Sequence, residues 1–467
     1  MRRVFLVLLL LSLAGCSERP KTHLEHIQAR GELLVVTRNS PTTYYIAAHG
    51  EAGLEFELAS RFANHLGVEL RLIVAERFGE ILPMVVRGEA DLAAAGLTAT
   101  ESRRAFVRFG PTYQEITQQV VYRRGSWRPR GIEELNRGEL EVVAGSSHAE
   151  RLEDLLTRYP DLHWRNNGEL DSEELLHLVA QQLIDYTVAD SNDIAMNQRF
   201  HPELRVAFDL TEPQPLAWAL PPGDDDSLLQ ASQEFFTKLR KDGTLEQLLE
   251  RYYGHVARFD YVGTRLYLRH IQQRLPKFRQ IFEQAAAENE LDWRLLAAMG
   301  YQESHWNPRA RSPTGVRGIM MLTQVTAAQL DIDNRLDPDQ SIAGGTRYFR
   351  IVKDKIPERI PEPDRTWMAL AAYNVGFGHL EDARRLTERR GGDPDKWVEV
   401  KKTLPLLSQR KWYKQTRYGY ARGREPVRYV DNVRSYYDLL VWHLEREQSY
   451  SATPKAPAAP KVLSPVL

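Results

Sequence analysis

The residue best suited to chemistry in this sequence is Glu303, near the end of a helix predicted over 292–304. Leu296, Met299, Gly300 and Glu303 follow one another at spacings of three, one and three, so they share the apolar face of that helix. Burial and the negative end of the helix dipole both disfavour a charged carboxylate at this position. A carboxylic acid that stays protonated near neutral pH is what general-acid cleavage of a glycosidic bond needs.

On this helix alone, a glutamate whose side chain reaches out to solvent is the simpler interpretation. The short segments elsewhere in the second half of the chain favour the catalytic one. These segments are Glu303-Ser304, Gly318-Ile319-Met320, Ala372-Tyr373-Asn374, and Tyr429 with Val430 to Arg434. In this order and spacing, over about 277–437, they resemble the motifs of the lytic transglycosylases of the lysozyme-like superfamily.

That resemblance implies cleavage of the β-1,4 bond between N-acetylmuramic acid and N-acetylglucosamine in peptidoglycan, with a 1,6-anhydro end as product. Retaining and inverting glycosidases use two carboxyl groups, whereas the matched motifs offer only Glu303. The muramyl acetamido group and C6 hydroxyl would then replace the second carboxyl, and Glu303 would act first as acid and then as base. Glu362, Asp364 and Asp431 are acids that the sequence leaves open, and a hydrolytic muramidase is an alternative.

The matched motifs also supply expected supporting residues: Ser304, Met320, Tyr373, Asn374 and Tyr429. Ser304 would bond Glu303 or the acetamido group, or be only a helix-end hydroxyl. Tyr373 and Asn374 would line a sugar groove or merely end their helix, and Tyr429 would orient Glu303 or fill the core. Members of this family commonly have glutamine where Met321 stands, so the subsites near Met321 are left open.

A second group of residues predicts a small-molecule site in the first half of the chain. The stretch over 96–103 resembles the segment of amino-acid-binding periplasmic proteins whose arginine grips the ligand carboxylate. By this resemblance Arg103 holds the carboxylate and Asp190 holds the ammonium group. Ser146 and Ser147 precede a helix, where backbone N–H groups and hydroxyls would hold the same anion, and Tyr44 would cover the ligand. Surface salt bridges and strand-edge packing are the alternatives. An amino acid or a muropeptide is the expected ligand, and hinge closure would couple its binding to cleavage.

The first sixteen residues predict export. Two arginines precede an apolar run over 4–13, which is too short to span a bilayer, and no later stretch is long enough. The sequence Leu13-Ala14-Gly15-Cys16 resembles the bacterial lipobox. Residues 1–15 are therefore predicted to be a signal peptide, Cys16 a lipid anchor and 16–30 a polar tether, with an ordinary cleaved signal as the alternative. Ser17 favours the periplasmic face of the outer membrane.

The elements that must position these residues change character near residue 258. Short apolar strands alternate with amphipathic helices over 31–258, with strands at 33–36 and 68–74 and a helix that carries Leu58, Phe62 and Leu66. This alternation predicts two α/β lobes with largely parallel sheets. Over 259–448 helices are predicted at 264–284, 292–304, 339–356, 365–374 and 429–444. Residues 449–467, rich in Pro and Ala, are predicted to be a disordered tail.

Length and composition agree with this division. A chain of 467 residues is long enough for two or three domains, and 62 basic against 63 acidic residues give no whole-chain attraction to nucleic acid. The stretch over 401–428 is rich in Lys, Arg, Trp and Tyr, which suits sugar rings and stem-peptide carboxylates or a solvated basic face; export argues against nucleic acid. Neither a metal-ligating cluster nor a nucleotide-binding glycine motif is present, so no metal and no cofactor are expected.

The succession of lipobox, α/β lobes and helical domain resembles the membrane-bound lytic murein transglycosylase F family over nearly the whole chain. The resemblance implies a two-lobed α/β domain like the type II periplasmic binding proteins, followed by a mainly α lysozyme-like domain. It also implies peptidoglycan as the partner and a membrane contact through the lipid anchor. The alternative of a different class is a lipid-anchored solute-binding sensor whose helical domain only holds the cell wall.

Overall fold

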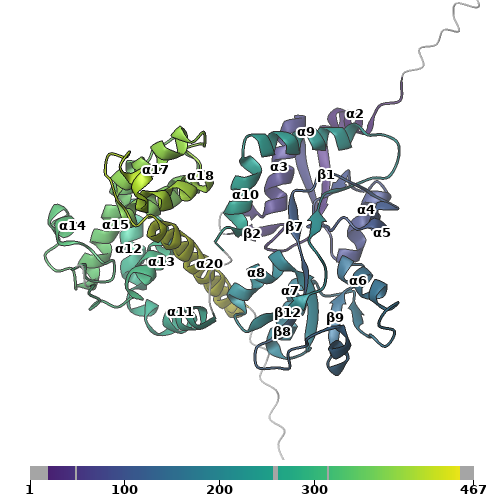
Figure 1. Ribbon diagram of the computed structural model, residues 1–467, viewed down its shortest axis with the longest axis horizontal. Coiled ribbons are helices and arrows are strands. Elements are labelled where there is room, and N and C mark those ends of the chain that lie inside the picture. Colours follow the sequence, from purple (N-terminus) through teal and green to yellow (C-terminus); the bar gives the residue numbers. More distant parts are fainter. Residues whose placement is uncertain (1–18, 48–49, 256–260, 313–314, 453–467) are drawn as a thin grey trace, which may run out of the picture. The chain divides into compact units, whose positions relative to one another are not determined.

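The computed structural model of the protein describes residues 19–47, 50–255, 261–312 and 315–452 (Figure 1). Within them the chain forms two compact units. The first takes the residues up to Gln118 together with Leu140–Leu175 and Asp209–Asp242, and the second takes Gln119–Glu139, Leu176–Phe208 and the residues from Gly243 onward. The predicted signal peptide, Cys16 and the boundary at 258/259 lie outside the described residues.

The first unit is built on a five-stranded sheet in the order β4-β1-β5-β14-β6. β1 (Glu32–Thr37) pairs in parallel with β4 (Glu69–Val74) and β5 (Leu92–Ala93), whereas β14 (Ala219–Leu220) is antiparallel to β5 and to β6 (Arg108–Phe109). The helices α3 (Leu54–Leu66) and α4 (Ile81–Val86) pack against β1, which buries Leu33, Val35 and Val36 completely. The strands and the helix predicted for this region are confirmed.

Further elements complete the first unit. Within it, β9 pairs with β10 in parallel. Two further pairs are antiparallel: β7 pairs with β13, and β2 pairs with β3. The bounds of these elements are β2 (Tyr45–Ala47), β3 (Gly50–Ala52), η1 (Phe78–Glu80), α5 (Glu101–Arg104), β7 (Gln114–Ile116), β9 (Leu140–Val143), α6 (Ser147–Leu155), β10 (Arg165–Asn167), β13 (Gln214–Leu216) and α9 (Ser227–Lys241).

The stretch predicted as a polar tether is in part a helix. Residues His23–Arg30 form α2, which packs against α9 and β1 and buries Ile27. Thr22 and Glu25 cap its start reciprocally, and the His23 backbone N–H donates to Asp225 at 2.6 Å. The Thr-x-x-Glu capping pattern was the signal for this helix. A stretch with a single buried apolar residue has no amphipathic period, which is why the tether prediction is wrong for these residues.

The second unit begins with α/β elements. β11, β8 and β12 lie side by side in the order β11-β8-β12. The α/β elements that belong mainly to this unit are β8 (Gln118–Arg123), η2 (Ile132–Arg137), α7 (Ser172–Gln181), β11 (Tyr186–Asp190), α8 (Ser191–Phe200), β12 (Leu204–Asp209) and α10 (Thr244–Tyr253).

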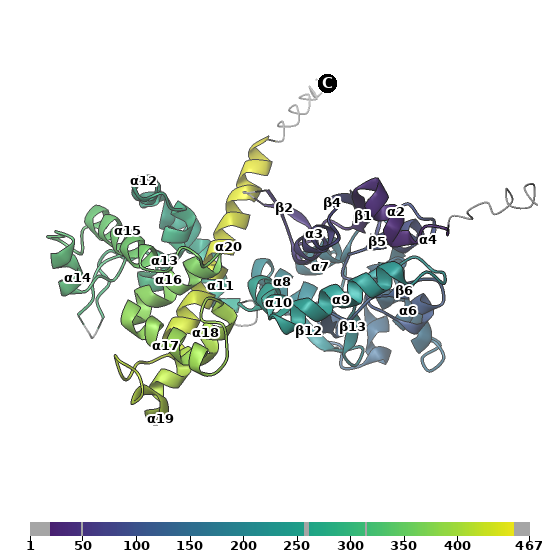
Figure 2. The same ribbon diagram turned by 90° about the horizontal axis from the view of Figure 1, so that it is seen from above.

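The rest of the second unit is helical, as predicted. Its helices are α11 (Tyr261–Gln273), η4 (Leu275–Lys277), α12 (Arg279–Asn289), α13 (Trp293–Ser304), α14 (Gln324–Gln329), α15 (Pro338–Asp354), α16 (Asp364–Val375), α17 (Phe377–Arg389), α18 (Trp397–Thr403), η5 (Leu404–Ser408), α19 (Arg410–Tyr413) and α20 (Arg424–Ala452). Both α13 and α16 pack against the long α20 (Figure 2). Gly300 and small side chains on α13 and α16, among them Ala297, Ala298, Ala371 and Ala372, are buried in this core, which lets the helices approach closely.

Two predicted helices differ from those observed. The helix predicted over 264–284 is divided into α11 and α12 by the 3₁₀ turn η4, which contains Pro276. A proline in a helix interior removes a hydrogen bond and clashes with the preceding turn, so the chain breaks there. At the other end, α20 starts before the predicted residue 429 and continues to Ala452, beyond the boundary suggested at 448. Residues 453–467 lie outside the described part of the chain.

Polar contacts inside the second unit join its α/β elements to α20. Asp438 of α20 is bound by Arg199 of α8 and by His255 Nε2, the latter at 2.7 Å. Burial lowers the pKa of His255 to about 3, so this imidazole is neutral. The rings of Phe200 and Trp442 add an apolar contact, with their centroids 5.0 Å apart. These contacts explain why part of the α/β region belongs to the same compact unit as the helices. None of the described helices has the length and apolar character needed to cross a membrane.

Candidate functional site

Glu303 lies in the last turn of α13, as predicted. The helix begins after Asp292, whose carboxylate accepts a hydrogen bond from the Arg294 backbone N–H at 2.8 Å. It ends at His305, which has a left-handed conformation with φ of 53°. Leu296, Met299 and Gly300 on the same face are buried, so the predicted apolar face is confirmed. The helix therefore places Glu303 at the border between the apolar core and the surface.

The environment of Glu303 favours the protonated acid. The side chain is partly exposed, but enough protein surrounds its carboxyl group that loss of hydration raises the pKa of Glu303 to about 7. The phenol of Tyr429 acts in the opposite direction and lowers this pKa, although its hydroxyl makes no hydrogen bond of standard geometry with any group in the described residues. Near neutral pH a substantial fraction of Glu303 therefore carries the proton that a general acid needs.

Three of the predicted residues come together from three helices. Tyr373 is on α16 and Tyr429 on α20, and their rings lie nearly parallel with centroids 6.3 Å apart. Burial and the negative charge of Glu303 raise the pKa of both phenols well above the usual value. Both tyrosines are thus neutral hydrogen-bond donors beside a carboxyl group. The helical packing that buries α13, α16 and α20 together is what builds this cluster.

Ser304 and Tyr373 hold the turn that carries the Gly-Ile-Met motif. The Ser304 hydroxyl donates to the Ile319 carbonyl at 2.8 Å, and the Tyr373 hydroxyl donates to the Met320 carbonyl at 3.0 Å. Gly318 begins this turn with φ of 85°. A Cβ atom at Gly318 would lie 1.8 Å from the Arg335 carbonyl oxygen, so no other residue fits. Ser304 thus fixes this turn, and its hydroxyl donates to the Ile319 carbonyl and not to Glu303.

The other predicted supporting residues have different surroundings. The Met320 side chain is completely buried against Gly345, so it packs the core and offers no side-chain contact to a substrate. Met321 has a left-handed conformation with φ of 47° and is partly exposed. Asn374 is exposed at the end of α16. Of the last three positions, Met321 and Asn374 are accessible from solvent.

The three acids that the sequence left open are engaged elsewhere. Glu362 is bound by Lys353 Nζ at 2.9 Å, and Asp364 is fully buried and accepts from the Trp397 backbone N–H at 2.6 Å. Asp431 is buried, and its negative charge acts to raise the pKa of Arg434, although burial lowers that pKa overall. Among the described residues, only burial and Tyr429 shift the pKa of Glu303, and no carboxylate does so. Glu303 is therefore an acid whose pKa no carboxylate of the described residues shifts.

This environment predicts the pH dependence of catalysis. The general acid must be protonated in the free enzyme, so kcat/KM should fall as pH rises through about 7, the pKa of Glu303. Tyr429→Phe removes the hydroxyl that lowers this pKa, so the descending limb should move to higher pH. Initial rates of peptidoglycan cleavage between pH 5 and 9 test this. Tyr348→Phe, a change of a nearby phenol that does not act on Glu303, should leave the limb in place, and an unmoved limb in Tyr429→Phe contradicts the assignment.

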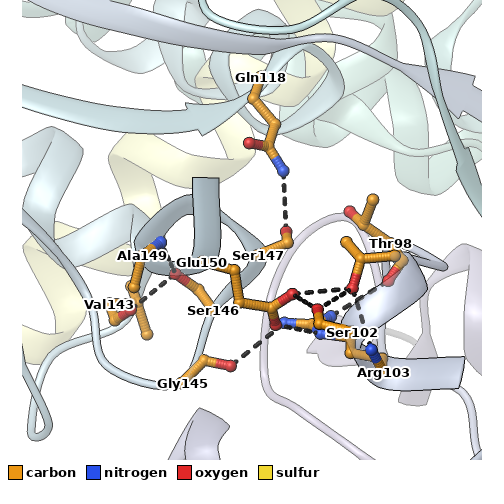
Figure 3. Close-up of polar contacts among 11 residues, drawn as sticks. Thr98, Ser102, Arg103, Gln118, Val143, Gly145, Ser146, Ser147, Ala149 and Glu150 are labelled. Carbon is orange, nitrogen blue, oxygen red and sulfur yellow. Dashed lines mark hydrogen bonds and ion pairs between the residues drawn. The ribbon is translucent and has the colours of Figure 1, made fainter. Parts of the chain in front are cut away.

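The residues predicted to bind a small ligand lie in the α/β region, and Figure 3 shows Arg103, Ser146 and Ser147 among them. Arg103 is on α5 with only 1% of its side chain exposed, and its Nε donates to Glu150 at 2.6 Å. Its Nη1 and Nη2 donate to the Thr98 and Gly145 carbonyls at 3.2 and 3.1 Å. Glu150 was not predicted from the sequence. Its position in the first turn of α6, the helix that Ser146 caps, was the available signal.

The remaining predicted ligand residues have internal partners. Ser146 caps α6, because its hydroxyl accepts from the Ala149 backbone N–H, and it donates to the Val143 carbonyl at 2.6 Å (Figure 3). Ser147 accepts from Gln118 Nε2 at 2.9 Å. Asp190 is buried at the end of β11 in the second unit, and the Tyr44 hydroxyl donates to Glu51 at 3.0 Å in the first. The two serines thus lie at the start of α6, the helix whose first turn carries Glu150, the partner of Arg103.

Comparison with protein families finds two matching models. Residues 33–255 match the bacterial extracellular solute-binding proteins, family 3, and residues 280–395 match the transglycosylase SLT domain. Part of the chain is also similar to a solved structure, the P235GK mutant of ArgBP from T. maritima, with 23% identity, coverage of 50% of this chain and 99% of that chain, and a TM-score of 0.45. The family models confirm the predicted fold class, a two-lobed solute-binding domain of type II followed by a helical lysozyme-like domain.

Curated relatives match nearly the whole chain. A protein of Alkalilimnicola ehrlichii named membrane-bound lytic murein transglycosylase F 1 is 57% identical over 90% of this chain and 85% of its own length. Proteins named membrane-bound lytic murein transglycosylase F from Ectopseudomonas mendocina and Pseudomonas fluorescens are 53% and 48% identical over 93% and 98% of this chain and 89% and 95% of their own lengths. These matches extend over both halves of the chain, and the chain belongs to the membrane-bound lytic murein transglycosylase F family.

Proposed function

We propose that this protein is a peptidoglycan lytic transglycosylase in which Glu303 is both the acid and the base. It cleaves the β-1,4 bond between N-acetylmuramic acid and N-acetylglucosamine and leaves a 1,6-anhydromuramoyl end. The observation that carries the proposal is the pKa of Glu303, which burial raises to about 7 at a position still accessible from the surface. Membership in the family supports the same activity.

The reaction follows from where the proton lies. Protonated Glu303 donates to the glycosidic oxygen, so the bond between that oxygen and the muramyl C1 breaks and the N-acetylglucosamine leaves as an alcohol. The carboxylate that results then accepts the proton of the muramyl C6 hydroxyl as that oxygen bonds to C1. The tyrosine phenols of Tyr373 and Tyr429 stay neutral, so they line the acid without competing for its proton.

The lone acid supports attack by the substrate's own hydroxyl. Inverting and retaining glycosidases need a second carboxyl group about 5–10 Å away to activate water or to attack C1. No carboxylate of the described residues acts on Glu303. The muramyl acetamido oxygen would then stabilise the positive charge that develops at C1, in place of a carboxylate. Asn374 is proposed to contact the sugar with its exposed side chain. Ser304 is proposed to support the sugar site indirectly, because it holds the turn that contains Ile319.

Identification of the product ends tests this function. Purified peptidoglycan is digested with the full chain, and the fragments are analysed by mass spectrometry. Anhydro ends are expected. Reducing ends would instead establish a hydrolytic muramidase, and the absence of any fragments would support the sensor alternative, in which the helical domain only binds the wall.

The position of the enzyme in the cell is a further part of the proposal. The lipobox at 13–16 supports acylation of Cys16, and Ser17 supports the outer membrane, with the enzyme on its periplasmic face. Cys16→Ser should abolish incorporation of labelled palmitate and release the protein from the membrane fraction. Incorporation that persists in Cys16→Ser contradicts lipidation at this residue.

The α/β domain is proposed to bind an amino acid or a muropeptide and to regulate cleavage. The match to solute-binding proteins supports a ligand, and Arg103 and Asp190 supply one cation and one anion for a zwitterion. Ser146, Ser147 and Tyr44 are the proposed accompanying contacts. The bonds of Asp438 to Arg199 and His255 give the second unit a direct connection from α8 to α20, the helix that also carries Tyr429. A cleavage rate that is unchanged at saturating ligand contradicts this regulation.

A further inference from the structure

Arg103 is buried and bound by protein groups, although it is the residue expected to hold a ligand. Its side chain is 1% exposed, and three of its five N–H groups donate to Glu150, Thr98 and Gly145 (Figure 3). The two carbonyl acceptors belong to the backbone and are fixed in place. Glu150 is the only one of the three partners that is a side chain, so it is the only one that a rotation about single bonds can remove.

Glu150 is bound in the way that a ligand carboxylate would be. One oxygen accepts from Arg103 Nε at 2.6 Å, and the other accepts from the Thr100 and Ser102 hydroxyls at 2.8 and 2.5 Å. These donors lie in the stretch over 96–103 that resembles the carboxylate-binding segment of amino-acid-binding proteins. The Glu150 side chain is 28% exposed, against 1% for Arg103. Glu150 therefore lies on the solvent side of the arginine.

We infer that Glu150 is a tethered carboxylate that occupies the anion position at Arg103, and that a ligand binds by displacing it with its own carboxylate. The inference rests on the proposed ligand binding by the α/β domain and names the residue that sets its affinity. The expected ligand class is an amino acid or short peptide with a free α-carboxylate. Compounds without a carboxylate cannot replace Glu150, because they would leave the buried guanidinium without a charge partner.

Displacement has an energetic consequence. A group held on the same domain competes at a high effective concentration, so a free carboxylate binds more weakly than it would to a vacant site. Burial acts to raise the pKa of Glu150, but Arg103 and the Ser102 and Thr100 hydroxyls outweigh it and hold this pKa below its usual value. Glu150 thus remains a charged competitor at neutral pH. Loss of one charge-assisted hydrogen bond of this kind changes a binding constant by about tenfold or more.

The test compares ligand affinity in the full chain and in Glu150→Ala by titration calorimetry. The probes are the twenty L-amino acids, D-alanine and the dipeptide L-alanyl-D-glutamate, and each probe that binds is titrated again as its carboxamide. At least one carboxylate is expected to bind Glu150→Ala about tenfold more tightly than the wild type, with no gain for its amide. Glu150→Gln, which keeps the size of the side chain and one acceptor oxygen but not its charge, should show part of this gain even if Glu150→Ala folds poorly.

Glu153→Ala is the matched control, since Glu153 is an exposed acid on the same helix. It should bind every probe as the wild type does. Equal affinity of wild type and both Glu150 variants, binding to none of them, weaker binding by the variants, or an equal gain for the amides overturns the inference. Peptidoglycan cleavage by the same preparations reports separately on the proposed enzymatic function, because Glu303 lies in a different compact unit.

Discussion

Glu303→Gln is expected to reduce the release of anhydro-ended fragments from purified peptidoglycan by about 1,000-fold. Glutamine has nearly the size of glutamate but has no proton of the required acidity. General acid–base groups contribute about 10² to 10⁴-fold to a rate, and here the same carboxyl serves both steps. Initial rates of fragment release, followed by mass spectrometry, measure the loss. Strand cleavage that continues at a rate near that of the wild type would contradict the central role of this acid.

Two controls separate lost chemistry from lost folding. Glu362→Gln removes an acid that is bound by Lys353 and does not act on Glu303, so it should leave the rate within about twofold. Thermal unfolding of Glu303→Gln supplies the second control. The pKa of Glu303 is raised in the folded state, so its contribution to stability is complete at low pH and is lost as pH rises through about 7. Glutamine does not ionise, so at pH 8 the variant should be at least as stable as the wild type.

Gly318→Ala is expected to lower the free energy of unfolding by about 3–5 kcal/mol, with a corresponding loss of active enzyme. The added Cβ would lie 1.8 Å from the Arg335 carbonyl oxygen and 2.6 Å from Ser341 Oγ, in a backbone conformation with φ of 85°. The turn must then move, and with it the Ile319 and Met320 carbonyls that bind Ser304 and Tyr373. Urea unfolding of the purified variant measures the loss.

Gly315→Ala is a matched control for this substitution. Gly315 has φ of 86°, almost the same as Gly318, but apart from its chain neighbours no atom of the described residues lies within 4 Å of an added Cβ. Gly315→Ala should therefore cost only the backbone strain, about 1–2 kcal/mol. If the two variants were equally stable, the close approach at Gly318 would not be the cause of its cost. Activity per folded molecule should fall in Gly318→Ala and stay unchanged in Gly315→Ala.

The position of Glu303, the proposed catalytic acid, was predictable because it depends on a local rule. The spacing of Leu296, Met299 and Gly300 places Glu303 on the buried face of one helix. In the structure this helix extends to Ser304, and these three residues are buried. By resemblance to a family, Tyr429 was expected to orient Glu303, and Tyr373 was expected to line a sugar groove. Which atoms they bind depends on how α13, α16 and α20 pack, and that packing determined that Tyr373 donates to the Met320 carbonyl.

Several other positions were decided by contacts distant in sequence. Met320 lies in a matched motif, yet its side chain is in the core, because Gly345 on α15 leaves the space for it. Arg103 was expected to meet a ligand, and in the fold it meets Glu150, 47 residues along the chain. No period of 2 or 3.6 residues reports on such a pair, since its two members belong to different elements.

The sequence by itself determined the division into an α/β and a helical part, the helix that carries the acid, and the motifs that identify the chemistry. These features follow from hydrophobic periods, capping residues and short-range spacing, which act over a few turns of the chain. The tertiary structure alone decided the raised pKa of Glu303, the hydrogen bonds of Ser304 and the occupation of Arg103 by Glu150. Each of these depends on which groups from separate elements exclude water from a charge or share a proton with it, and only the packed fold brings those groups together.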